Sequence, residues 1–241
     1  MKNVEKTCDE LVSWLRYKVK EAGGKGLVFG LSGGIDSAVV AGLAKKAFPK
    51  NSLGVIMPCH SEPIDKEHGI LVADSLDLQT EIVDLTRTYD QLIQSINLKN
   101  TNKLAMANIK PRLRMTTLYY FAQSYNYLVT GSSNKSEFTI GYFTKHGDSG
   151  VDLLPLASFI KKDIWEMAKY LKIPKIIIEK PPTAGLWENQ TDEEEMGFGY
   201  DILDNYILNN TGPEELVEKI KKMNRISQHK RAFPPIFKPK E

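Results

Sequence analysis

The chain has 241 residues, of which 41% are hydrophobic and 26% are charged, as is typical of a globular protein with one large or two small domains. Its formal net charge of +2 does not indicate a basic surface for binding nucleic acid, and no apolar run is long enough to cross a bilayer. Because the N-terminus lacks the apolar core of a signal peptide and Cys8 and Cys59 are too few for a disulfide framework, we expect a cytoplasmic protein without nucleic-acid or membrane partners.

Helix and strand patterns alternate in the first half of the chain. An amphipathic opening helix runs from Val4 to Val19, and a short apolar strand at 26–31 leads into a helix at 35–47. The pattern then predicts strands at 52–57, 80–85 and 127–131, with helices at 64–77, 86–96 and 111–125 between them. This alternation favours an α/β fold with a doubly wound parallel sheet, which binds ligands at the carboxyl ends of its strands.

The character of the sequence changes after residue 140. Residues 141–153 are rich in turn formers and charges, and helices are expected at 160–171, 192–208 and 213–226. Residues 178–191 contain Pro181, Pro182 and Gly185 and are interpreted as a loop that closes over a substrate. The end from 229 onward is basic and proline-rich, which excludes regular structure there. We expect one domain over 1–241, with a nucleotide-binding α/β core in 1–140 and substrate loops and C-terminal helices in 141–241.

The string SGGIDS at 32–37 falls between the first strand and its helix. Backbone N–H groups at a helix N-terminus favour a phosphate-sized anion, and Gly33 and Gly34 allow positive φ angles and let a ligand approach the backbone closely. Ser32 and Ser37 add hydroxyl donors. Asp36 would repel a phosphate unless a cation lies between them, so it predicts Mg²⁺ beside phosphate oxygens. An ordinary turn with a serine cap is the alternative, and the missing P-loop lysine excludes a Walker-type site.

A second carboxylate for the metal site is found in the string GSSNKSE at 131–137, where the fourth strand ends. Glu137 falls about one helical turn beyond Ser132 and Ser133, at the ligand-binding edge of the sheet. Together with Asp36 it would provide two carboxylates from neighbouring strand ends. The alternative is a capping box in which Ser133 caps a helix and Glu137 faces solvent. The residues alone leave both interpretations open.

The string GYFTKHGDSGVDLLPL at 141–156 holds Lys145, Asp148 and Asp152 around two glycines. The two acids are common turn formers. Asp152, however, adjoins an apolar run, where an unpaired buried carboxylate is strongly destabilising. It therefore needs a partner, which is Lys145, a group of backbone N–H donors or a ligand. Lys161, before a predicted helix, would ordinarily belong to a solvated face.

Six strings in a fixed order carry a family resemblance over nearly all of residues 1–233. They are SGGIDS, NIKPRLRM, GSSNKSE, FTKHGDSGVDLLPL, KPPTAGLW and QHKR. In this order they resemble the ammonia-dependent NAD synthetases, which are members of the N-type ATP pyrophosphatases. SGGxDS alone marks only that superfamily, whereas the K-x-G-D-x-x-x-D-x-x-P spacing and the terminal HK pair are far more specific. Family members that use glutamine carry an amidohydrolase domain before this one, and with a single helix before the first strand no glutaminase domain is expected.

The resemblance implies a Rossmann-like fold of the adenine nucleotide alpha hydrolase type. It also implies a ligase that uses ATP as co-substrate to activate the carboxylate of deamido-NAD (nicotinic acid adenine dinucleotide) as an acyl adenylate. Ammonia then attacks the adenylate to give NAD, AMP and pyrophosphate. Mg²⁺ is the implied metal, and the implied assembly is a homodimer whose partner chain helps to form the dinucleotide site. The aromatic-rich helix ending in LYYFAQSYNY suits such an interface and equally suits a core.

Positions that match the family's motifs take its expected roles. ATP would contact Gly30, Leu31, Ser32, Gly33, Gly34, Ile35, Asp36, Ser37, Ser132, Lys161 and Thr183, and Asp36 and Glu137 would hold the metal. Deamido-NAD would contact Arg112, Tyr142, Lys145, Asp152, His229 and Lys230. The catalytic candidates are Asp148, as the base that takes a proton from ammonium, and Lys161, as a cation near the departing pyrophosphate. Ser132 stands where the family commonly has Thr. Tyr142 stands where it often has Phe, and either ring would stack on nicotinate.

Two other functions compete with this interpretation. Another N-type pyrophosphatase, such as a tRNA-modifying enzyme, is disfavoured by the near-neutral charge and by the absence of a catalytic cysteine motif. A non-catalytic nucleotide-binding module is disfavoured by the two metal-binding carboxylates, which simple binding would not require.

Overall fold

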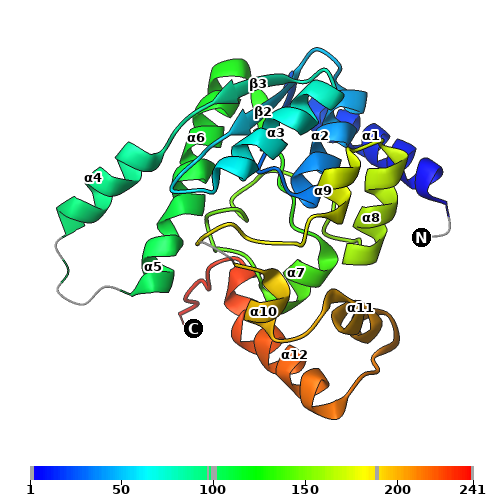
Figure 1. Cartoon of the computed structure of the whole chain (residues 1–241), viewed down its shortest axis with the longest axis vertical. Coiled ribbons are helices and arrows are strands. Elements are labelled where there is room, and N and C mark those ends of the chain that lie inside the picture. Colours follow the sequence, from blue (N-terminus) through cyan, green and yellow to red (C-terminus); the bar gives the residue numbers. More distant parts are fainter. Residues whose placement is uncertain (1–2, 97, 99–101, 188–189, 240–241) are drawn as a thin grey trace.

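Four short parallel strands form one sheet in a computed structural model that describes residues 3–96, 98, 102–187 and 190–239 (Figure 1). They are β1 (Gly26–Gly30), β2 (Ser52–Ile56), β3 (Gln79–Ile82) and β4 (Tyr127–Val129), in the order β3-β2-β1-β4. Leu27 pairs with Ser52 on one side and with Leu128 on the other, so the carboxyl end of β1 lies between those of β2 and β4. Beyond β4, Thr130 pairs in parallel with Leu153, which brings the 141–153 segment to the same place.

Helices cover both faces of this sheet, which confirms the predicted doubly wound α/β fold. On one face, α1 (Val4–Glu21), α2 (Ile35–Ala47) and α8 (Lys161–Tyr170) pack apolar residues against β1 in the largest core, joined by residues of α3 (Pro63–Ser75) and α9 (Lys175–Glu179). On the other face, α4 (Thr86–Ile96) and α6 (Ile109–Tyr125) pack against β2 and β4 through Tyr89, Leu118 and Ala122. The short helix α5 (Lys103–Ala107) precedes α6.

The remaining helices gather around a smaller core away from the sheet (Figure 1). They are α7 (Lys135–Ile140), α10 (Asp192–Met196), α11 (Tyr200–Asn209), α12 (Glu214–Ile226) and the 3-10 turn η1 (Gln228–Lys230). Ile140 of α7 joins Met196, Leu203 and Ile220 in this core, so α7 connects the sheet to the C-terminal helices. Within the described ranges, no helix is long and apolar enough to span a bilayer.

Several predicted elements need correction. The single helix expected over 192–208 is wrong, because Gly197 takes a left-handed φ of +75° and ends α10 before α11 begins. The helix expected from 111 begins at Ile109, and Pro111 is tolerated because an N–H in the first turn of a helix has no intrahelical acceptor. The strand expected over 80–85 ends at Ile82, and helices α5 and α9 were not expected. Helix α7 was expected only in the capping-box alternative.

Candidate functional site

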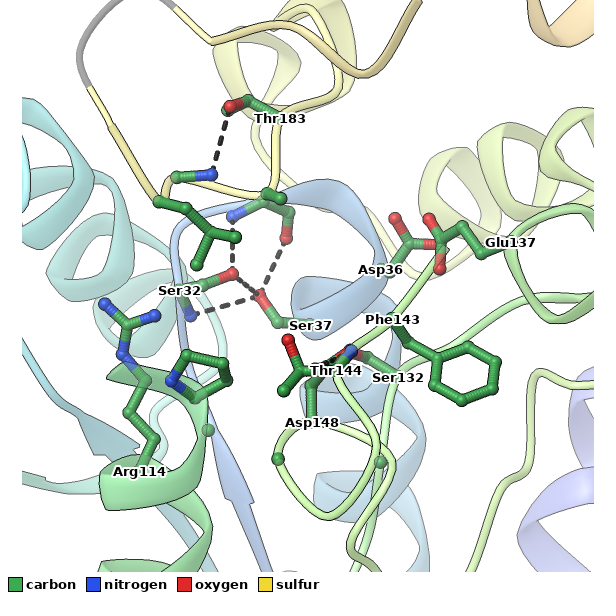
Figure 2. A pocket seen from close by; sticks show the side chains of 18 of the residues that line it. Ser32, Asp36, Ser37, Arg114, Ser132, Glu137, Phe143, Thr144, Asp148 and Thr183 are labelled. Carbon is green, nitrogen blue, oxygen red and sulfur yellow. Dashed lines mark hydrogen bonds between the residues drawn. The ribbon is translucent and has the colours of Figure 1, made fainter. Parts of the chain in front are cut away.

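A pocket of about 400 Å³ opens at the carboxyl ends of β1, β2 and β4 (Figure 2). The 30–37 loop, the 141–151 segment, the N-terminus of α8 and the 180–186 segment form much of its wall. Most of the predicted site residues line it, namely Gly30, Leu31, Ser32, Gly34, Ile35, Asp36, Ser37, Ser132, Glu137, Tyr142, Asp148, Lys161, Thr183 and Lys230. The fold therefore brings residues from both halves of the chain to one cavity.

The SGGIDS loop is held in shape by its two serines (Figure 2). The backbone N–H of Ser32 donates to Oγ of Ser37 over 3.3 Å, and the two hydroxyl oxygens lie 3.1 Å apart. Ser37 donates to the carbonyl oxygen of Gly34 over 2.8 Å, and the N–H of Gly34 donates to Oγ of Ser32 over 3.3 Å. The loop thus turns tightly into α2, whose N-terminus lies at the pocket. That arrangement favours a phosphate-sized anion.

The two glycines of this loop have different roles. Gly33 has a φ of +76°, and a Cβ there would lie 2.6 Å from the carbonyl oxygen of Asp65 and 2.7 Å from Cβ of His68, because α3 packs against the loop. Gly34 is the N-cap of α2 with a φ of −91° and extended backbone. Gly33 uses the positive φ that glycine allows, whereas Gly34 does not, because a helix N-cap residue takes extended angles.

Lys161 lies buried between two carboxylates. Its Nζ atom is 2.6 Å from Oδ2 of Asp36 and 3.3 Å from Oε1 of Glu137, and its side chain is 1% exposed. Burial alone lowers the pKa of Lys161, but the two carboxylates outweigh it and raise that pKa above its ordinary value. Burial and repulsion from Asp36 raise the pKa of Glu137. The solvated-face interpretation of Lys161 is therefore wrong, and the pocket wall holds more carboxylate than ammonium.

Asp36, Glu137 and Lys161 form what we call the Lys161 cluster, and Asn134 connects its two acidic residues. Its side-chain oxygen accepts from the N–H of Glu137 over 3.0 Å, and Oε2 of Glu137 accepts from the N–H of Asn134 over 3.3 Å. Its Nδ2 donates to Oδ1 of Asp36 over 2.9 Å. The capping box exists, but its N-cap is Asn134 and not Ser133, and Glu137 faces the cluster and not solvent. The N-x-x-E spacing at 134–137 is the pattern that identifies this cap.

Two acids and a tyrosine from the C-terminal helices support the cluster, and sequence reasoning missed all three. Asp204 accepts from the hydroxyl of Ser136 and, over 2.9 Å, from the backbone N–H of Lys162, so it satisfies the N-terminus of α8. The hydroxyl of Tyr200 donates to Oδ2 of Asp192 over 2.8 Å. These residues follow no motif, because only tertiary packing places α10 and α11 beside α7 and α8.

Asp148 lies in the pocket on the turn that follows Phe143. The backbone N–H of Thr144 donates to its Oδ1 over 2.8 Å. The side chain is accessible from the cavity, but the surrounding walls remove much of its hydration. This desolvation raises the pKa of Asp148 against the opposing effects of the Thr144 N–H, Lys230 and Arg114. A carboxylate with a raised pKa is a better proton acceptor near neutral pH.

Three predicted substrate contacts form a basic group outside the pocket lining. The guanidinium of Arg112 donates to the carbonyl oxygen of Lys145 over 3.3 Å, and Nζ of Lys145 donates to the carbonyl oxygen of His229 over 2.8 Å. Arg112 and His229 are exposed. Lys230, next in the chain, lines the pocket and donates to the carbonyl oxygens of Gly141 and Phe143, each over 2.8 Å.

Asp152 also lies outside the pocket lining and has structural partners. Its Oδ2 accepts from the backbone N–H of Val129 over 2.8 Å, and its Oδ1 accepts from the hydroxyl of Tyr119 over 3.0 Å. Asp152 is exposed, so the expectation that it is buried beside the apolar run is wrong. Its hydrogen-bond partners are a backbone donor and a tyrosine, and not Lys145. These hydrogen bonds fix the 152–153 backbone beside β4.

Three lysines hold the 180–187 segment at the pocket. Lys180 pairs with Asp65 of α3 over 2.6 Å, and the buried Lys110 of α6 donates to the carbonyl oxygen of Leu186 over 2.8 Å. Nζ of Lys103 lies 5.0 Å from the centre of the Trp187 ring, which is half-buried. The predicted loop at 178–191 begins within α9, and residues 188 and 189 lie outside the described part of the chain.

The sequence pattern of the family described as NAD synthase matches residues 7–234. The chain belongs to the NAD synthase family. The NH(3)-dependent NAD(+) synthetase of Carboxydothermus hydrogenoformans is 54% identical over 239 residues, covering 97% of this chain and 98% of that protein. The protein of the same name from Finegoldia magna is 52% identical over 237 residues, covering 98% of this chain and 97% of that protein.

Solved structures of similar proteins share the fold over almost the whole chain. NMN synthetase from Francisella tularensis superposes with a TM-score of 0.93 at 36% identity, covering 98% of this chain and 99% of that one. NH3-dependent NAD synthetase from Campylobacter jejuni, in complex with the nitrate ion, superposes with a TM-score of 0.82 at 30% identity, with the same coverage. The parallel sheet and the helices around it are therefore those of NAD synthases.

Proposed function

We propose that this chain is an ammonia-dependent ligase that converts deamido-NAD to NAD at the expense of ATP. The observation that carries the proposal is the position of Asp36, Lys161 and Glu137 beside the 30–37 loop, with Asp148 in the same cavity. A phosphate-binding loop, a cation and a proton acceptor in one pocket suit a reaction that first activates a carboxylate and then aminates it.

In the first step an oxygen of the nicotinate carboxylate attacks the α-phosphorus of ATP, and pyrophosphate leaves with the electron pair of the broken P–O bond. The 30–37 loop binds the phosphates, while Ser132 and Thr183 contact ATP from other walls of the pocket. Lys161 stabilises the negative charge that develops on pyrophosphate, because its ammonium is already fixed in a partly dry site. The product is the acyl adenylate.

Asp36 and Glu137 are the residues that would hold Mg²⁺. Their carboxylate oxygens are hard ligands, and the single ammonium of Lys161 leaves them with excess negative charge. Among the residues that the structure describes, no three or more His, Cys, Asp or Glu side chains are arranged to hold a metal by themselves. When bound, the ion would neutralise phosphate charge, and unit charges ~4 Å apart at a partly shielded site interact by about 4 kcal/mol.

In the second step ammonia attacks the acyl carbon and AMP leaves. Ammonium has no lone pair, so it must lose a proton before or during the attack. Asp148 accepts that proton, and its raised pKa suits the role. The nicotinate ring stacks on Tyr142, whose hydroxyl is held by Oε2 of Glu195 over 2.7 Å. The rest of the dinucleotide extends toward Lys230 and the basic group of Arg112, Lys145 and His229, with Asp152 beside it.

The 180–187 segment is the lid of this pocket. Its contacts with Lys110, Asp65 and Lys103 close the cavity on the side of Thr183. Keeping water away from the acyl adenylate protects it from hydrolysis, which would release AMP without forming NAD.

The active assembly is a homodimer in the cytoplasm. Tyr120 and Tyr125 on α6 are 70% and 45% exposed, an unusual exposure for two aromatic residues on one helix, and they would be covered at a subunit interface. Cys8 and Cys59 are free thiols, which suits a reducing compartment. Sedimentation of the purified chain tests the assembly, and Tyr120→Lys should shift it toward the monomer.

A second candidate substrate is nicotinate mononucleotide. The observation that favours it is the close match to the NMN synthetase of Francisella tularensis. Tyr142 and Asp148, which are proposed to contact the nicotinate end of the substrate, line the pocket. The residues proposed to contact the rest of the dinucleotide lie outside the pocket lining, namely Arg112, Lys145 and His229. A mononucleotide would present the same carboxylate to the same groups.

Mass detection of products tests both candidates. The chain is incubated with ATP, Mg²⁺ and ammonium together with deamido-NAD or nicotinate mononucleotide. We expect NAD and AMP in equal amounts from deamido-NAD, with a higher kcat/KM than for the mononucleotide. Absence of NAD, or AMP without an equal amount of amidated product, contradicts the proposal, and a higher kcat/KM for the mononucleotide assigns the second candidate.

A further inference from the structure

Tyr200 reaches the Lys161 cluster from the C-terminal helices. It begins α11, and its side chain is 1% exposed. Its hydroxyl oxygen lies 2.8 Å from Oδ2 of Asp192 and 3.4 Å from Oε1 of Glu137. The centre of its ring lies 4.8 Å from Nζ of Lys161. One neutral side chain therefore contacts the ammonium and two carboxylates around it.

The charges around Tyr200 are unequal. Asp192 is 3% exposed and adds a third carboxylate to Asp36 and Glu137, against one ammonium. Burial raises the pKa of Asp192, while attraction to Lys161 and the hydrogen bond from Tyr200 oppose that rise. Asp192 and the two other carboxylates therefore compete for Lys161, and the Tyr200 hydroxyl supplies Asp192 with a donor of its own.

The position of Tyr200 is fixed by the protein and needs no ligand. Its backbone N–H donates to Oε1 of Glu193 over 3.0 Å, which fastens the junction of α10 and α11. Its ring belongs to the core that contains Met196, Leu203 and Ile220. Burial and the neighbouring carboxylates raise the pKa of the Tyr200 hydroxyl, so it stays a hydrogen-bond donor throughout the neutral range.

We propose that Tyr200 is a positioning residue that, by donating to Asp192, keeps the ammonium of Lys161 directed at Asp36 and Glu137. The inference rests on the proposed function, in which Lys161 acts on pyrophosphate. Without the hydroxyl, the buried carboxylate of Asp192 keeps Tyr142 as its other hydroxyl donor and is drawn more strongly to Lys161, whose ammonium already attracts it. The ammonium then moves toward Asp192, and Asp36 and Glu137 are left with less compensating charge.

Tyr200→Phe tests this role because it removes the hydroxyl and keeps the ring. We expect kcat for adenylation, measured as pyrophosphate release, to fall on the order of tenfold to a hundredfold, as for the loss of a hydrogen bond to a charged group. KM for ATP should change little. Mn²⁺ binding without nucleotide, measured by electron paramagnetic resonance, should become severalfold tighter, because Lys161 no longer neutralises the two carboxylates. General loosening of the site would weaken Mn²⁺ binding instead.

The double variant Tyr200→Phe/Asp192→Asn separates positioning from packing. Removing the charge of Asp192 removes the competitor for Lys161, so the double variant should recover most of the lost kcat and the original Mn²⁺ affinity. Tyr206→Phe, on the same helix and partly buried in the same core, is the matched control and should leave both values unchanged.

Two results overturn the inference. One is a Tyr200→Phe protein whose kcat and Mn²⁺ affinity stay within twofold of the unmodified chain. The other is a double variant no better than the single one. If the unmodified chain forms no NAD from deamido-NAD, only the proposed function is contradicted. The Mn²⁺ measurement needs no turnover, so it still decides the role of Tyr200.

Discussion

Nζ of Lys161 and Oδ2 of Asp36 lie 2.6 Å apart, and this contact joins the start of α8 to the start of α2. Both side chains are shielded from bulk water, so removing either leaves the other buried with less of its compensating charge. This ion pair thus joins two helices and also involves the phosphate-binding loop, which contains Asp36. Substitutions of either residue should affect catalysis and stability to different extents.

Asp36→Asn should reduce Mg²⁺-dependent adenylation by about a hundredfold or more, a loss comparable to that of one transition-state donor. The fold should persist, because an amide keeps the shape of the side chain and Lys161 keeps Glu137 as a partner. Pyrophosphate release at limiting Mg²⁺ is the measurement, and Glu137→Gln should behave likewise. Asp77→Asn, at an exposed acid, is the control. Unchanged turnover of Asp36→Asn at limiting Mg²⁺ would rule out its role at the metal.

Asp148→Asn should spare the first step and slow the second. In a single turnover we expect normal pyrophosphate release and NAD formation slower by about a hundredfold to ten-thousandfold, the range for loss of a general base. Raising the pH should partly rescue the variant, because free NH₃ then becomes abundant. Equal slowing of both products without rescue would leave Asp148 a structural residue of its turn.

The raised pKa of Asp148 gives the same substitution a second readout. Desolvation makes the carboxylate less favourable in the folded chain than in the unfolded one. Asp148→Asn should therefore raise Tm at neutral pH. The gain should vanish as the pH falls below the usual carboxyl pKa of 3.8, where the acid is protonated in both states. A lower Tm at neutral pH would mean that the carboxylate is stabilising in its turn.

Gly33→Ala should destabilise the protein by about 2–5 kcal/mol, the combined cost of a left-handed backbone and an overpacked contact. The new methyl group would meet the backbone of Asp65, which cannot move independently of α3. Gly34→Ala is the matched control: its Cβ would lie 3.4 Å from Oγ of Ser32, and we expect a loss below about 1 kcal/mol. Urea unfolding of the two variants compares them, and equal stabilities would contradict the close packing of α3.

Lys110→Met should raise the ratio of AMP to NAD severalfold, because the 180–187 segment loses a charge-assisted hydrogen bond to the carbonyl oxygen of Leu186. The lid then opens more often, and water competes with ammonia for the adenylate. Both products are measured from one reaction. Lys175→Met, at an exposed lysine, should leave the ratio at one to one. A ratio near one for Lys110→Met would show that this contact does not protect the adenylate.

Sequence periodicity predicts the long elements of this fold, and its failures have local causes. Helices such as α1 and α2 repeat their apolar face over three or more turns. By contrast, α5 and α9 have five residues each and too few turns to show a period. The break at Gly197 follows from one left-handed residue inside an otherwise helical pattern.

The residues of the candidate site likewise divide into those that the sequence predicts and those that only the structure reveals. Asp36, Glu137 and Lys161 occur in recognisable strings, and the structure places them together. The contacts of Asn134 with Asp36 and of Tyr200 with Glu137 join residues distant in sequence, so they depend on packing that no local pattern encodes. The positions of Lys145 and His229 outside the pocket lining likewise follow from the path of the chain after β4, and Arg112 joins them from α6.

The contact between Lys161 and Asp36 spans 125 residues, and this separation has a consequence for synthesis. A ribosome completes the SGGIDS loop well before it adds α8, so the growing chain contains Asp36 long before it contains the ammonium that pairs with it. Asp192 and Tyr200 are added later still. Because the pocket takes its walls from both halves of the chain, competence for ATP cleavage begins only when the C-terminal helices have docked.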